Sequence, residues 1–460
     1  MSQPYTYANP VLSLWQAAAA EVQRRHASVR SRMATATARR MAMAAQPAPD
    51  DLMAPARMIG EPLGAGQTLS QGALAAAPVR AGAPLKAPMT VGGVVGDCAV
   101  TAAQFLWAEM TGNQQQSELL AGELKDSVCD PGWAECLTTY LAYKVSGGKL
   151  PYRPNLNPVI DLGGATQVAI VGDWGTGDEV AINLLQQVAS LHPDVLIHLG
   201  DVYYAGTQME EQANFLDICR EFLGSQVPVF SLCGNHDMYS GGNGYYGLVD
   251  QLGQQASYFC LQNANWQFVA MDTGHNDSDP LTVATHMTSL VSVEGWSEAN
   301  WVVQKIQQAG GRRTVLLSHH QLFSAFASVG SVNGQAYAYN PNLHGALQSV
   351  LSEVVLWFWG HEHTLALYGP YMGLQRGRCV GASAVPVFTD QQAYATATGL
   401  QTYENAPMPV WNTNATLGNN GTDYNNAFAM MMLDGSSATV MYYQVPPLGT
   451  ATAYAVTDSV

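Results

Sequence analysis

The chain has 460 residues, of which 47% are hydrophobic and only 12% are charged, and its formal net charge is −16. This composition excludes an intrinsically disordered chain and is that of a globular protein long enough for a large core. The negative balance argues against a nucleic-acid groove, because binding to a polyanion depends on clustered Lys and Arg. It does not exclude a small phosphate ester, since a metal cluster can provide the local positive centre that such a substrate needs.

The N-terminal third of the chain divides by composition into three parts. Residues 1–57 form a basic arm rich in Ala and Arg, with seven arginines and only three acidic residues. Residues 58–90 are rich in Pro, Ala and Gly and are predicted to be a linker, and residues 91–160 show the apolar spacing of a mainly helical accessory region. The arm fits either a helix that packs on its own domain or a targeting segment.

The sequence also bears on the compartment. It contains no apolar run long enough for a secretory signal or a membrane span. Its seven cysteines are irregularly spaced and form neither a disulfide framework nor a zinc motif. We therefore expect a protein of a reducing compartment, the cytoplasm, without a transmembrane segment.

From residue 165 onward, buried strands are predicted to alternate with helices. Five apolar runs are continuous rather than alternating, as expected for strands covered on both faces. These runs are residues 168–171, 195–197, 227–230, 315–317 and 354–359. Crossover helices are predicted at residues 178–191, 208–223 and 294–309.

Two hairpins and a long loop complete the predicted domain. The hairpins span residues 257–272 and 427–444. Residues 384–425 are rich in Thr, Asn, Gly and Gln, which is typical of a surface loop. We therefore expect an α/β domain over residues 165–445 and a C-terminal tail over residues 446–460.

A short polar block closes each of the five strands. The blocks are Gly172-Asp173-Trp174-Gly175, Gly200-Asp201-Val202-Tyr203-Tyr204, Gly234-Asn235-His236-Asp237, Ser318-His319-His320 and Gly360-His361-Glu362-His363. Because the carboxyl ends of strands in an open α/β sheet converge on one crevice, these side chains are expected to lie together. Two aspartates, an asparagine, a tyrosine and several histidines exceed what one metal ion needs and suit two.

A two-metal centre needs a bridging anion, and Asp201 stands at the end of a central strand, where its two oxygens can face two metals. Asp173, Asp201 and a phenolate from Tyr204 together carry a formal charge of −3, whereas a trivalent and a divalent metal carry +5. The resulting charge of +2 suits a phosphate dianion.

In order and spacing, the five blocks resemble the motif set of the calcineurin-like metallophosphoesterases, specifically that of the purple acid phosphatases: GDxG, GDxxY, GNH(D/E), a histidine after an apolar strand, and GHxH. The resemblance covers residues 165–370 and extends through the closing hairpin to residue 445, the end of the expected catalytic domain. It implies a four-layer α/β/β/α sandwich of two mixed sheets. It also implies hydrolysis of phosphate monoesters, of the acid phosphatase type, by a metal-bound hydroxide that attacks phosphorus in line.

The resemblance further implies which residues hold the metals. Fe(III) would be held by Asp173, Asp201, Tyr204 and His363, and a divalent ion (Zn, Fe or Mn) by Asp201, Asn235, His319 and His361. Hard phenolate and carboxylate oxygens suit the trivalent ion, while imidazole and amide donors suit the divalent one. His236 is expected to bind the phosphate and to protonate the leaving alkoxide.

Two positions depart from patterns common in the family. Gly175 stands where many relatives outside the purple group carry a histidine, which fits the tyrosinate version of the site. The fourth block reads His319-His320-Gln321 rather than His-x-Pro. His320, a candidate catalytic residue, therefore either contacts the substrate or is a loop histidine.

Three further polar residues receive supporting roles. His198, inside the second apolar run, is expected to be a hydrogen-bonded core residue. Asp237 and Glu362 are expected to orient the neighbouring histidines rather than to bind metal.

Two other functions stay open. A phosphodiesterase or nucleotide hydrolase would use the same metals, and relative rates on p-nitrophenyl phosphate and its bis ester separate it from a monoesterase. Alternatively, residues 1–160 make the chain a binding or anchoring protein with a secondary phosphatase domain, which deletion of those residues tests. The expected partner is a small phosphorylated substrate and not a nucleic acid, and the sequence does not determine the oligomeric state.

Overall fold

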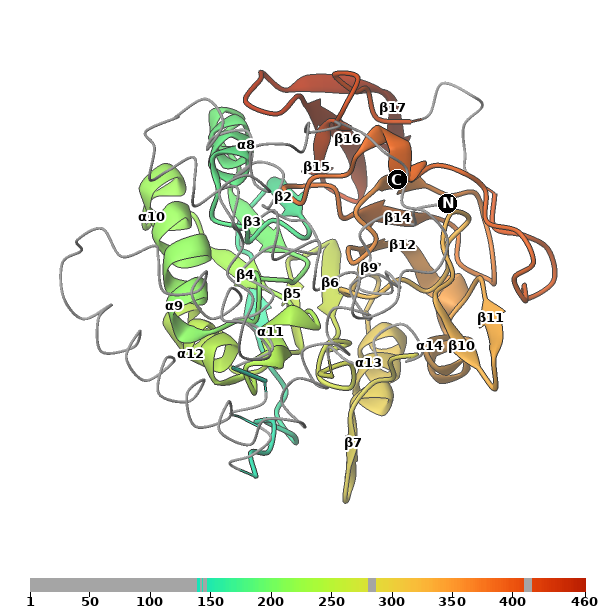
Figure 1. Ribbon diagram of the computed structural model, residues 1–460. Helices are drawn as coiled ribbons and strands as arrows, with labels where there is room; N and C mark the ends of the chain where they lie inside the picture. Colours follow the sequence, from blue (N-terminus) through green and yellow to red (C-terminus); the bar gives the residue numbers. More distant parts are fainter. Residues whose placement is uncertain (1–138, 141–142, 144–146, 280–286, 409–415) are drawn as a thin grey trace, which may run out of the picture. The chain divides into compact units, whose positions relative to one another are not determined.

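The computed structural model describes residues 139–140, 143, 147–279, 287–408 and 416–460 (Figure 1). Residues 143–460 belong to one compact unit, and the elements below lie within it. The predicted arm and linker, and the accessory region up to residue 138, lie outside the described residues. The described end of the accessory region, residues 147–160, is irregular chain that leads into a strand.

One mixed sheet has six strands in the order β17-β16-β15-β2-β3-β4. These strands are β2 (Gln167–Val171), β3 (Val195–His198), β4 (Val229–Ser231), β15 (Asn426–Asp434), β16 (Ser437–Val445) and β17 (Thr452–Ser459). The first three run parallel to one another, and β15 pairs antiparallel with both β2 and β16. The closing hairpin therefore extends a parallel sheet with antiparallel strands.

The other mixed sheet has seven strands in the order β1-β5-β6-β9-β12-β14-β13. These strands are β1 (Val159–Asp161), β5 (Phe259–Gln262), β6 (Trp266–Ala270), β9 (Arg313–Leu317), β12 (Val354–Trp359), β13 (Leu365–Leu367) and β14 (Gly377–Val380). The central strands β6, β9, β12 and β14 run parallel, so their carboxyl ends share one edge.

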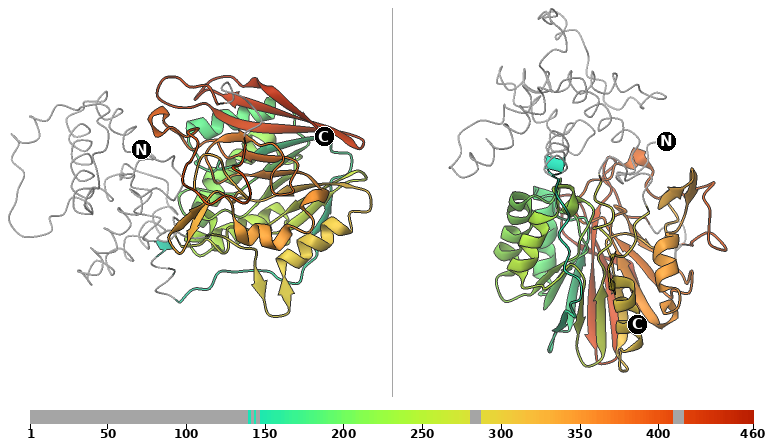
Figure 2. Two further views of the ribbon diagram at one scale, coloured as in Figure 1. Left: turned by 90° about the vertical axis from the view of Figure 1, so that its right-hand side faces the viewer. Right: turned by 90° about the horizontal axis from the view of Figure 1, so that it is seen from below.

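Helices cover the outer faces of both sheets (Figure 2). The six-stranded sheet is flanked by α8 (Glu179–Ser190), α9 (Gln208–Glu210), the π-helix η1 (Glu211–Leu216), α10 (Asp217–Leu223) and α12 (Asn243–Leu252). The seven-stranded sheet is flanked by α13 (Glu298–Gln307), α14 (Pro341–Leu347) and the short 3-10 helix η3 (Leu351–Glu353). No helix in the described part of the chain has the length and apolar character needed to span a membrane.

The remaining elements lie in the segments that connect the strands and helices of these layers. They are α11 (His236–Tyr239), the 3-10 helix η4 (Thr389–Gln391), and the hairpins β7 (Ser292–Val293) with β8 (Trp296–Ser297) and β10 (Gly330–Val332) with β11 (Gln335–Tyr337).

The continuous apolar runs are explained by burial on both sides of each strand. In β2, Val168 and Ile170 pack between the two sheets, whereas Ala169 and Val171 face the helical layer of α8. In β9, Leu317 likewise lies between the sheets. Such strands need an apolar residue at every position. The predicted four-layer α/β/β/α sandwich of two mixed sheets is confirmed.

Two boundaries differ from the prediction. Helix α13 begins at Glu298, because a hairpin occupies residues 292–297 and the Ser297 side chain caps the helix by accepting a hydrogen bond from the Asn300 N–H. At the other end of the chain, residues 452–459 form β17, which pairs with β16, so the sheet extends beyond residue 445.

A buried ion pair links the two sheets. Arg378 of β14 donates from Nε and Nη2 to the two Asp458 carboxylate oxygens of β17, both at 2.6 Å. The Tyr442 hydroxyl donates to Asp458 Oδ2 at 2.6 Å. Arg378 Nη1 donates to the carbonyls of Tyr368 and Gly377. Arg378, Asp458 and Tyr442 are hereafter called the Arg378 cluster. In this cluster, hydrogen-bond donors face hydrogen-bond acceptors.

Candidate metal centre

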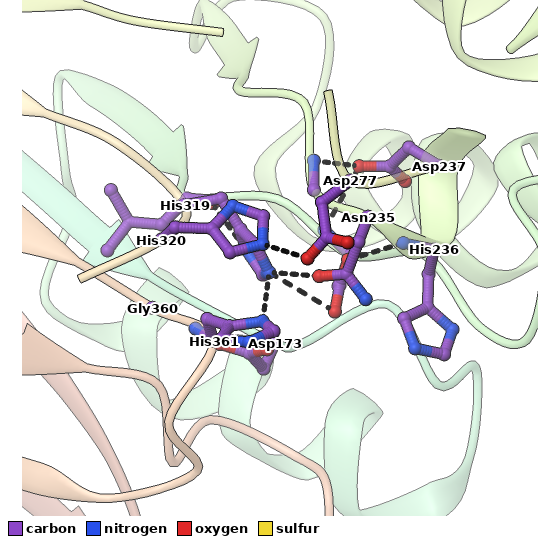
Figure 3. A network of polar contacts seen from close by, with 12 residues as sticks. Asp173, Asn235, His236, Asp237, Asp277, His319, His320, Gly360 and His361 are labelled. Atoms are coloured by element: carbon purple, nitrogen blue, oxygen red, sulfur yellow. Dashed lines mark hydrogen bonds and ion pairs between the residues drawn. The ribbon is translucent and has the colours of Figure 1, made fainter. Parts of the chain in front are cut away.

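The polar blocks follow β2, β3, β4, β9 and β12, and their side chains form one network (Figure 3). Two glycines of the blocks allow this close approach. A Cβ at Gly234 would overlap Asp201 Oδ1, and a Cβ at Gly360 would lie 2.6 Å from Asp173 Oδ2. Any side chain at these two positions would push a candidate ligand out of place.

Three candidate ligands have an unusual backbone. Asp173, Asp201 and His361 have φ angles of 56°, 76° and 64°, in the left-handed region that non-glycine residues rarely adopt. The conformation is held from within the site, because the His361 N–H donates to Asp173 Oδ2 at 2.7 Å. Strained backbone of this kind is concentrated at functional sites.

A first cluster surrounds the hydroxyl of Tyr203. This hydroxyl lies 3.1 Å from Asp173 Oδ1, 3.4 Å from Asp201 Oδ2 and 3.2 Å from His363 Nε2. His363 Nε2 in turn lies 3.4 Å from Asp173 Oδ1. All four side chains are buried. Two carboxylates, a phenol and an imidazole therefore point toward one small volume.

A second cluster surrounds Nε2 of His319. This nitrogen lies 3.1 Å from Asn235 Oδ1, 3.2 Å from His361 Nδ1 and 3.4 Å from Asp201 Oδ2. The Asn235 amide nitrogen donates to the Tyr239 hydroxyl at 2.7 Å, which turns the amide oxygen toward His319. The second cluster therefore consists of two imidazoles, an amide oxygen and a carboxylate.

Asp201 belongs to both clusters through a single atom. Its Oδ2 faces the Tyr203 hydroxyl on one side and His319 Nε2 on the other. Its Oδ1 accepts the backbone N–H of His236 at 3.0 Å. The sequence suggested that two oxygens would face two metals, whereas the structure assigns one oxygen to the shared position and the other to the backbone.

The second cluster fits a bound cation. His319 Nδ1 lies 3.0 Å from the Leu199 carbonyl, so in the neutral ring Nδ1 carries the proton and Nε2 presents a lone pair. That lone pair faces the oxygens of Asn235 and Asp201, which are also acceptors. Acceptors at such distances are compatible only when a proton or a metal ion lies between them. Imidazole, amide and carboxylate donors are ligands of divalent transition metals.

The pKa shifts of the histidines agree with a cation site at the second cluster. Burial opposes protonation of His319, but the charges of Asp201 and Asp173 outweigh it and raise the pKa of His319 to about 9. Burial, together with the neighbouring His320 and His319, holds the pKa of His361 well below its usual value. The cluster thus attracts positive charge while His361 stays neutral, as a metal ligand must be.

The tyrosine at the first cluster is Tyr203, one residue before the predicted Tyr204. The two tyrosines lie in a turn after β3, and it is the Tyr203 hydroxyl that faces the carboxylates of Asp173 and Asp201. The backbone fixes the choice: the Tyr203 N–H donates to the Gly175 carbonyl, and the Tyr204 N–H donates to Glu210. Tyr204 contributes its carbonyl, which faces His236.

His236 lies beside the first cluster. Its Nδ1 is 2.6 Å from the Tyr204 carbonyl, and its ring packs between those of Tyr203 and Tyr239 with centroids 4.7 and 4.6 Å away. Burial lowers the pKa of His236 to about 4, although Asp201 and the Tyr204 carbonyl favour the charged ring. An Nδ1 that donates to a carbonyl leaves Nε2 as the nitrogen that gains or loses a proton.

Asp237 and Glu362 differ from the expectation that they orient histidines. Asp237 accepts the backbone N–H groups of Asp201, Val202 and Gly234, so it fixes two ligand-bearing loops together. Glu362 accepts a hydrogen bond from the Ser324 hydroxyl at 2.7 Å. Both side chains support backbone or loop structure rather than an imidazole.

His320 and His198 are both buried. His198 Nδ1 lies 3.0 Å from the Ser231 hydroxyl, which confirms the predicted hydrogen-bonded core residue. His320 lies over His361, with ring centroids 4.3 Å apart, and its nitrogens contact Thr273 and Asp277 (Figure 3).

The sequence reading missed Thr273 and Asp277, although a signal was present. Both follow β6, which runs parallel to β9, so their loop starts at the same sheet edge as the loop of His319. The segment Asp272 to Asp277 is polar and follows a buried strand. The segment was not assigned to the site because it does not resemble a known motif.

A small cavity with a volume of about 10 Å³, room for about one water molecule, borders His363. Tyr394, Tyr424, Val385 and Val387 contribute to its wall. Most of these residues belong to the loop predicted at 384–425. Together with Asn425 and Asn426, the loop therefore forms a mixed aromatic, apolar and amide surface next to a candidate ligand.

Comparison with known sequences gives a match to part of the chain. Residues 166–365 match the sequence profile of the family described as calcineurin-like phosphoesterase. A search among curated proteins finds no match. The matched segment contains all of the candidate ligands described above.

Several solved structures are similar at low sequence identity. The GAP50 anchor of the inner membrane complex of Plasmodium shares 11% identity, with 64% of this chain and 88% of that chain covered and a TM-score of 0.39. PhoD shares 10% identity, with 66% and 70% covered and a TM-score of 0.43. A Vps29 double mutant from Entamoeba histolytica shares 12% identity, with 64% and 99% covered and a TM-score of 0.27.

Proposed function

We propose, on the premise that residues 166–365 form a calcineurin-like metallophosphoesterase domain, that the protein hydrolyses phosphate monoesters at a two-metal centre. The observation that supports this most directly is the shared position of Asp201 Oδ2, which faces both ligand clusters. A single carboxylate oxygen between two sets of donors is what a dinuclear site requires.

The two donor sets differ in a way that supports a mixed-valence centre. Asp173, Tyr203 and His363 would hold a trivalent ion together with Asp201, since a phenolate and two carboxylates are hard, anionic ligands. Asn235, His319 and His361 would hold a divalent ion together with Asp201. When bound, the metals would supply the positive charge that attracts a phosphate dianion and the acidity that makes water nucleophilic near neutral pH.

The protein's own residues would position the substrate and manage protons. With Nδ1 held by the Tyr204 carbonyl, the doubly protonated His236 ring would donate its Nε2 proton to the departing alkoxide, and its lowered pKa places this step in the acid range. Tyr394, Tyr424 and Asn425, which line the small cavity beside His363, would lie next to the bound ester.

Metal analysis, a visible spectrum and paired rate measurements test this function. We expect two metals per chain, a purple ferric–tyrosinate band, and faster hydrolysis of p-nitrophenyl phosphate than of bis(p-nitrophenyl) phosphate. A single metal would contradict the dinuclear centre. A colourless protein with two divalent metals would contradict the ferric site, and faster diester hydrolysis would contradict the monoesterase.

A further inference from the structure

His320 is held at both edges of its ring and at its backbone. Its N–H donates to Thr273 Oγ1 at 3.0 Å, its Nδ1 lies 3.1 Å from the same hydroxyl, and its Nε2 lies 3.1 Å from Asp277 Oδ2. The ring is buried and tilted by 39° against the ring of His361, with centroids 4.3 Å apart. Several independent contacts therefore fix the position of the ring.

These contacts define one proton arrangement. The Asp277 carboxylate accepts hydrogen bonds only, so Nε2 of the neutral His320 ring carries the proton and donates it to Asp277. Nδ1 is then the acceptor nitrogen, and the Thr273 hydroxyl, which also accepts the His320 backbone N–H, donates its proton to Nδ1. One His320 nitrogen lies within 4.8 Å of ligand nitrogens of His319 and His361, but the hydrogen bonds of both His320 nitrogens go to the loop that follows β6.

The loop that holds His320 is itself anchored. The Thr288 hydroxyl donates to the Thr273 carbonyl, and the Asn276 side chain donates to the Ser289 carbonyl at 2.9 Å. The Asp277 N–H donates to the Gly274 carbonyl at 2.9 Å. A loop tied to the neighbouring segment at two points and closed by an internal turn can hold the ring in a fixed position.

We propose that Thr273, Asp277 and His320 are positioning residues for the divalent metal. They hold the His320 ring against one face of His361, which keeps His361 Nδ1 directed toward His319 Nε2, 3.2 Å away. This role rests on the proposed function, since it requires that His361 is a ligand. It assigns His320 neither to the metal nor to the substrate but to the support of its neighbour.

Two matched pairs of variants test the role on the full-length protein. Thr273→Val removes the hydroxyl that contacts His320, and Thr273→Ser keeps it. Asp277→Leu removes the acceptor for Nε2, and Asp277→Asn keeps an acceptor oxygen. The readout is calorimetric titration of the metal-free protein with Zn²⁺, which reports each metal site separately from turnover.

We expect Thr273→Val and Asp277→Leu to weaken one of the two Zn²⁺ sites by about 10- to 100-fold, the usual effect of losing a partner outside the ligand shell. The Ser and Asn variants are expected to stay within about threefold of wild type, because they retain the contacts with His320. His344→Phe is the matched control. His344 is also buried and packs on an aromatic ring, that of Tyr403, and its substitution should leave both sites unchanged.

A double-mutant cycle separates the proposed role from simple loss of packing. If Thr273 acts through His320, the double variant Thr273→Val with His320→Phe should bind Zn²⁺ no more weakly than His320→Phe alone. Additive losses, or wild-type affinity in Thr273→Val and Asp277→Leu, would overturn the role while wild type still binds two metals. Failure of wild type to bind a second metal would overturn the proposed function itself and the role with it.

Discussion

Two buried polar clusters in this domain differ in one respect. In the Arg378 cluster, the guanidinium and the Tyr442 hydroxyl donate to the Asp458 carboxylate, so donors and acceptors match. Around His319, lone pairs of an imidazole, an amide and a carboxylate face one another at 3.1 to 3.4 Å. Both clusters are buried, yet only the second requires something from outside the chain.

The difference teaches how to separate structural from functional polar groups. Burial of charge marks both kinds, because either can be stabilised by suitable neighbours. A surplus of acceptors marks a cation site, since the missing positive charge must come from a proton or a metal. The backbone repeats the distinction: Asp173, Asp201 and His361 have left-handed φ angles, whereas Arg378 and Asp458 lie on regular strands.

The substitution Asp201→Asn should remove the surplus of hydrogen-bond acceptors around His319 and produce the largest effect. It removes the charge shared by the two clusters, so we expect loss of both metals and a fall in kcat/KM of about 10³-fold, or about 4 kcal/mol. The introduced amide can donate to His319 Nε2, so the metal-free protein should be no less stable in urea. A large drop in the urea midpoint, or retained metal and activity, would show that Asp201 has a structural role instead.

The substitution Arg378→Met should have the opposite profile. It leaves the Asp458 carboxylate buried without its main partner, which costs about 3–5 kcal/mol in the free energy of unfolding. Urea denaturation measures this loss, and activity per folded molecule should stay near wild type. Arg376→Met is the matched control: Arg376 Nε lies 3.9 Å from the same carboxylate and its side chain is 33% exposed, so we expect a loss below about 1 kcal/mol.

A comparison of Tyr203→Phe with Tyr204→Phe sharpens the first cluster. The two residues are adjacent and identical, but only the Tyr203 hydroxyl lies 3.1 Å from Asp173. We therefore expect Tyr203→Phe to remove the ferric–tyrosinate band and Tyr204→Phe to preserve it, with folding intact in both. The reverse result in the visible spectrum would restore the assignment of Tyr204 that the family motif implies.

The sequence predicted the buried strands well because burial on both faces leaves a continuous apolar run, whereas the four layers were implied by the family resemblance. The continuous run of residues 354–359 contains both Phe358, which lies between the sheets, and Trp357, which faces the helices. Strand β17 was missed because its residues Thr452–Ser459 alternate little and end in three polar residues. An edge strand pairs through its backbone, which side-chain patterns report poorly.

The sequence predicts those parts of the candidate site that depend only on residue type and on position in a motif. Asp201, His319 and His361 follow strand ends in known motifs, and the structure brings them together. The choice between Tyr203 and Tyr204 depends on which side of the chain faces the sheet edge, and a motif spacing does not contain that information. The pairing of His320 with Asp277 joins loops 43 residues apart, so only the fold reveals it.

Acidification should destabilise the Arg378 cluster, and this is the smallest of the predicted effects. Burial opposes ionisation of Asp458, but its hydrogen bonds with Arg378 outweigh burial and lower its pKa. A folded-state pKa below the unfolded value of about 3.9 gives stability that is complete above that pH and is lost as the pH falls through the folded-state pKa. The urea midpoint of wild type should therefore fall below pH 4 more steeply than that of Arg378→Met, in which the lowered pKa is lost. Equal slopes would mean that Asp458 does not cause this pH dependence. The Arg378 cluster would then stabilise the protein through packing rather than through charge.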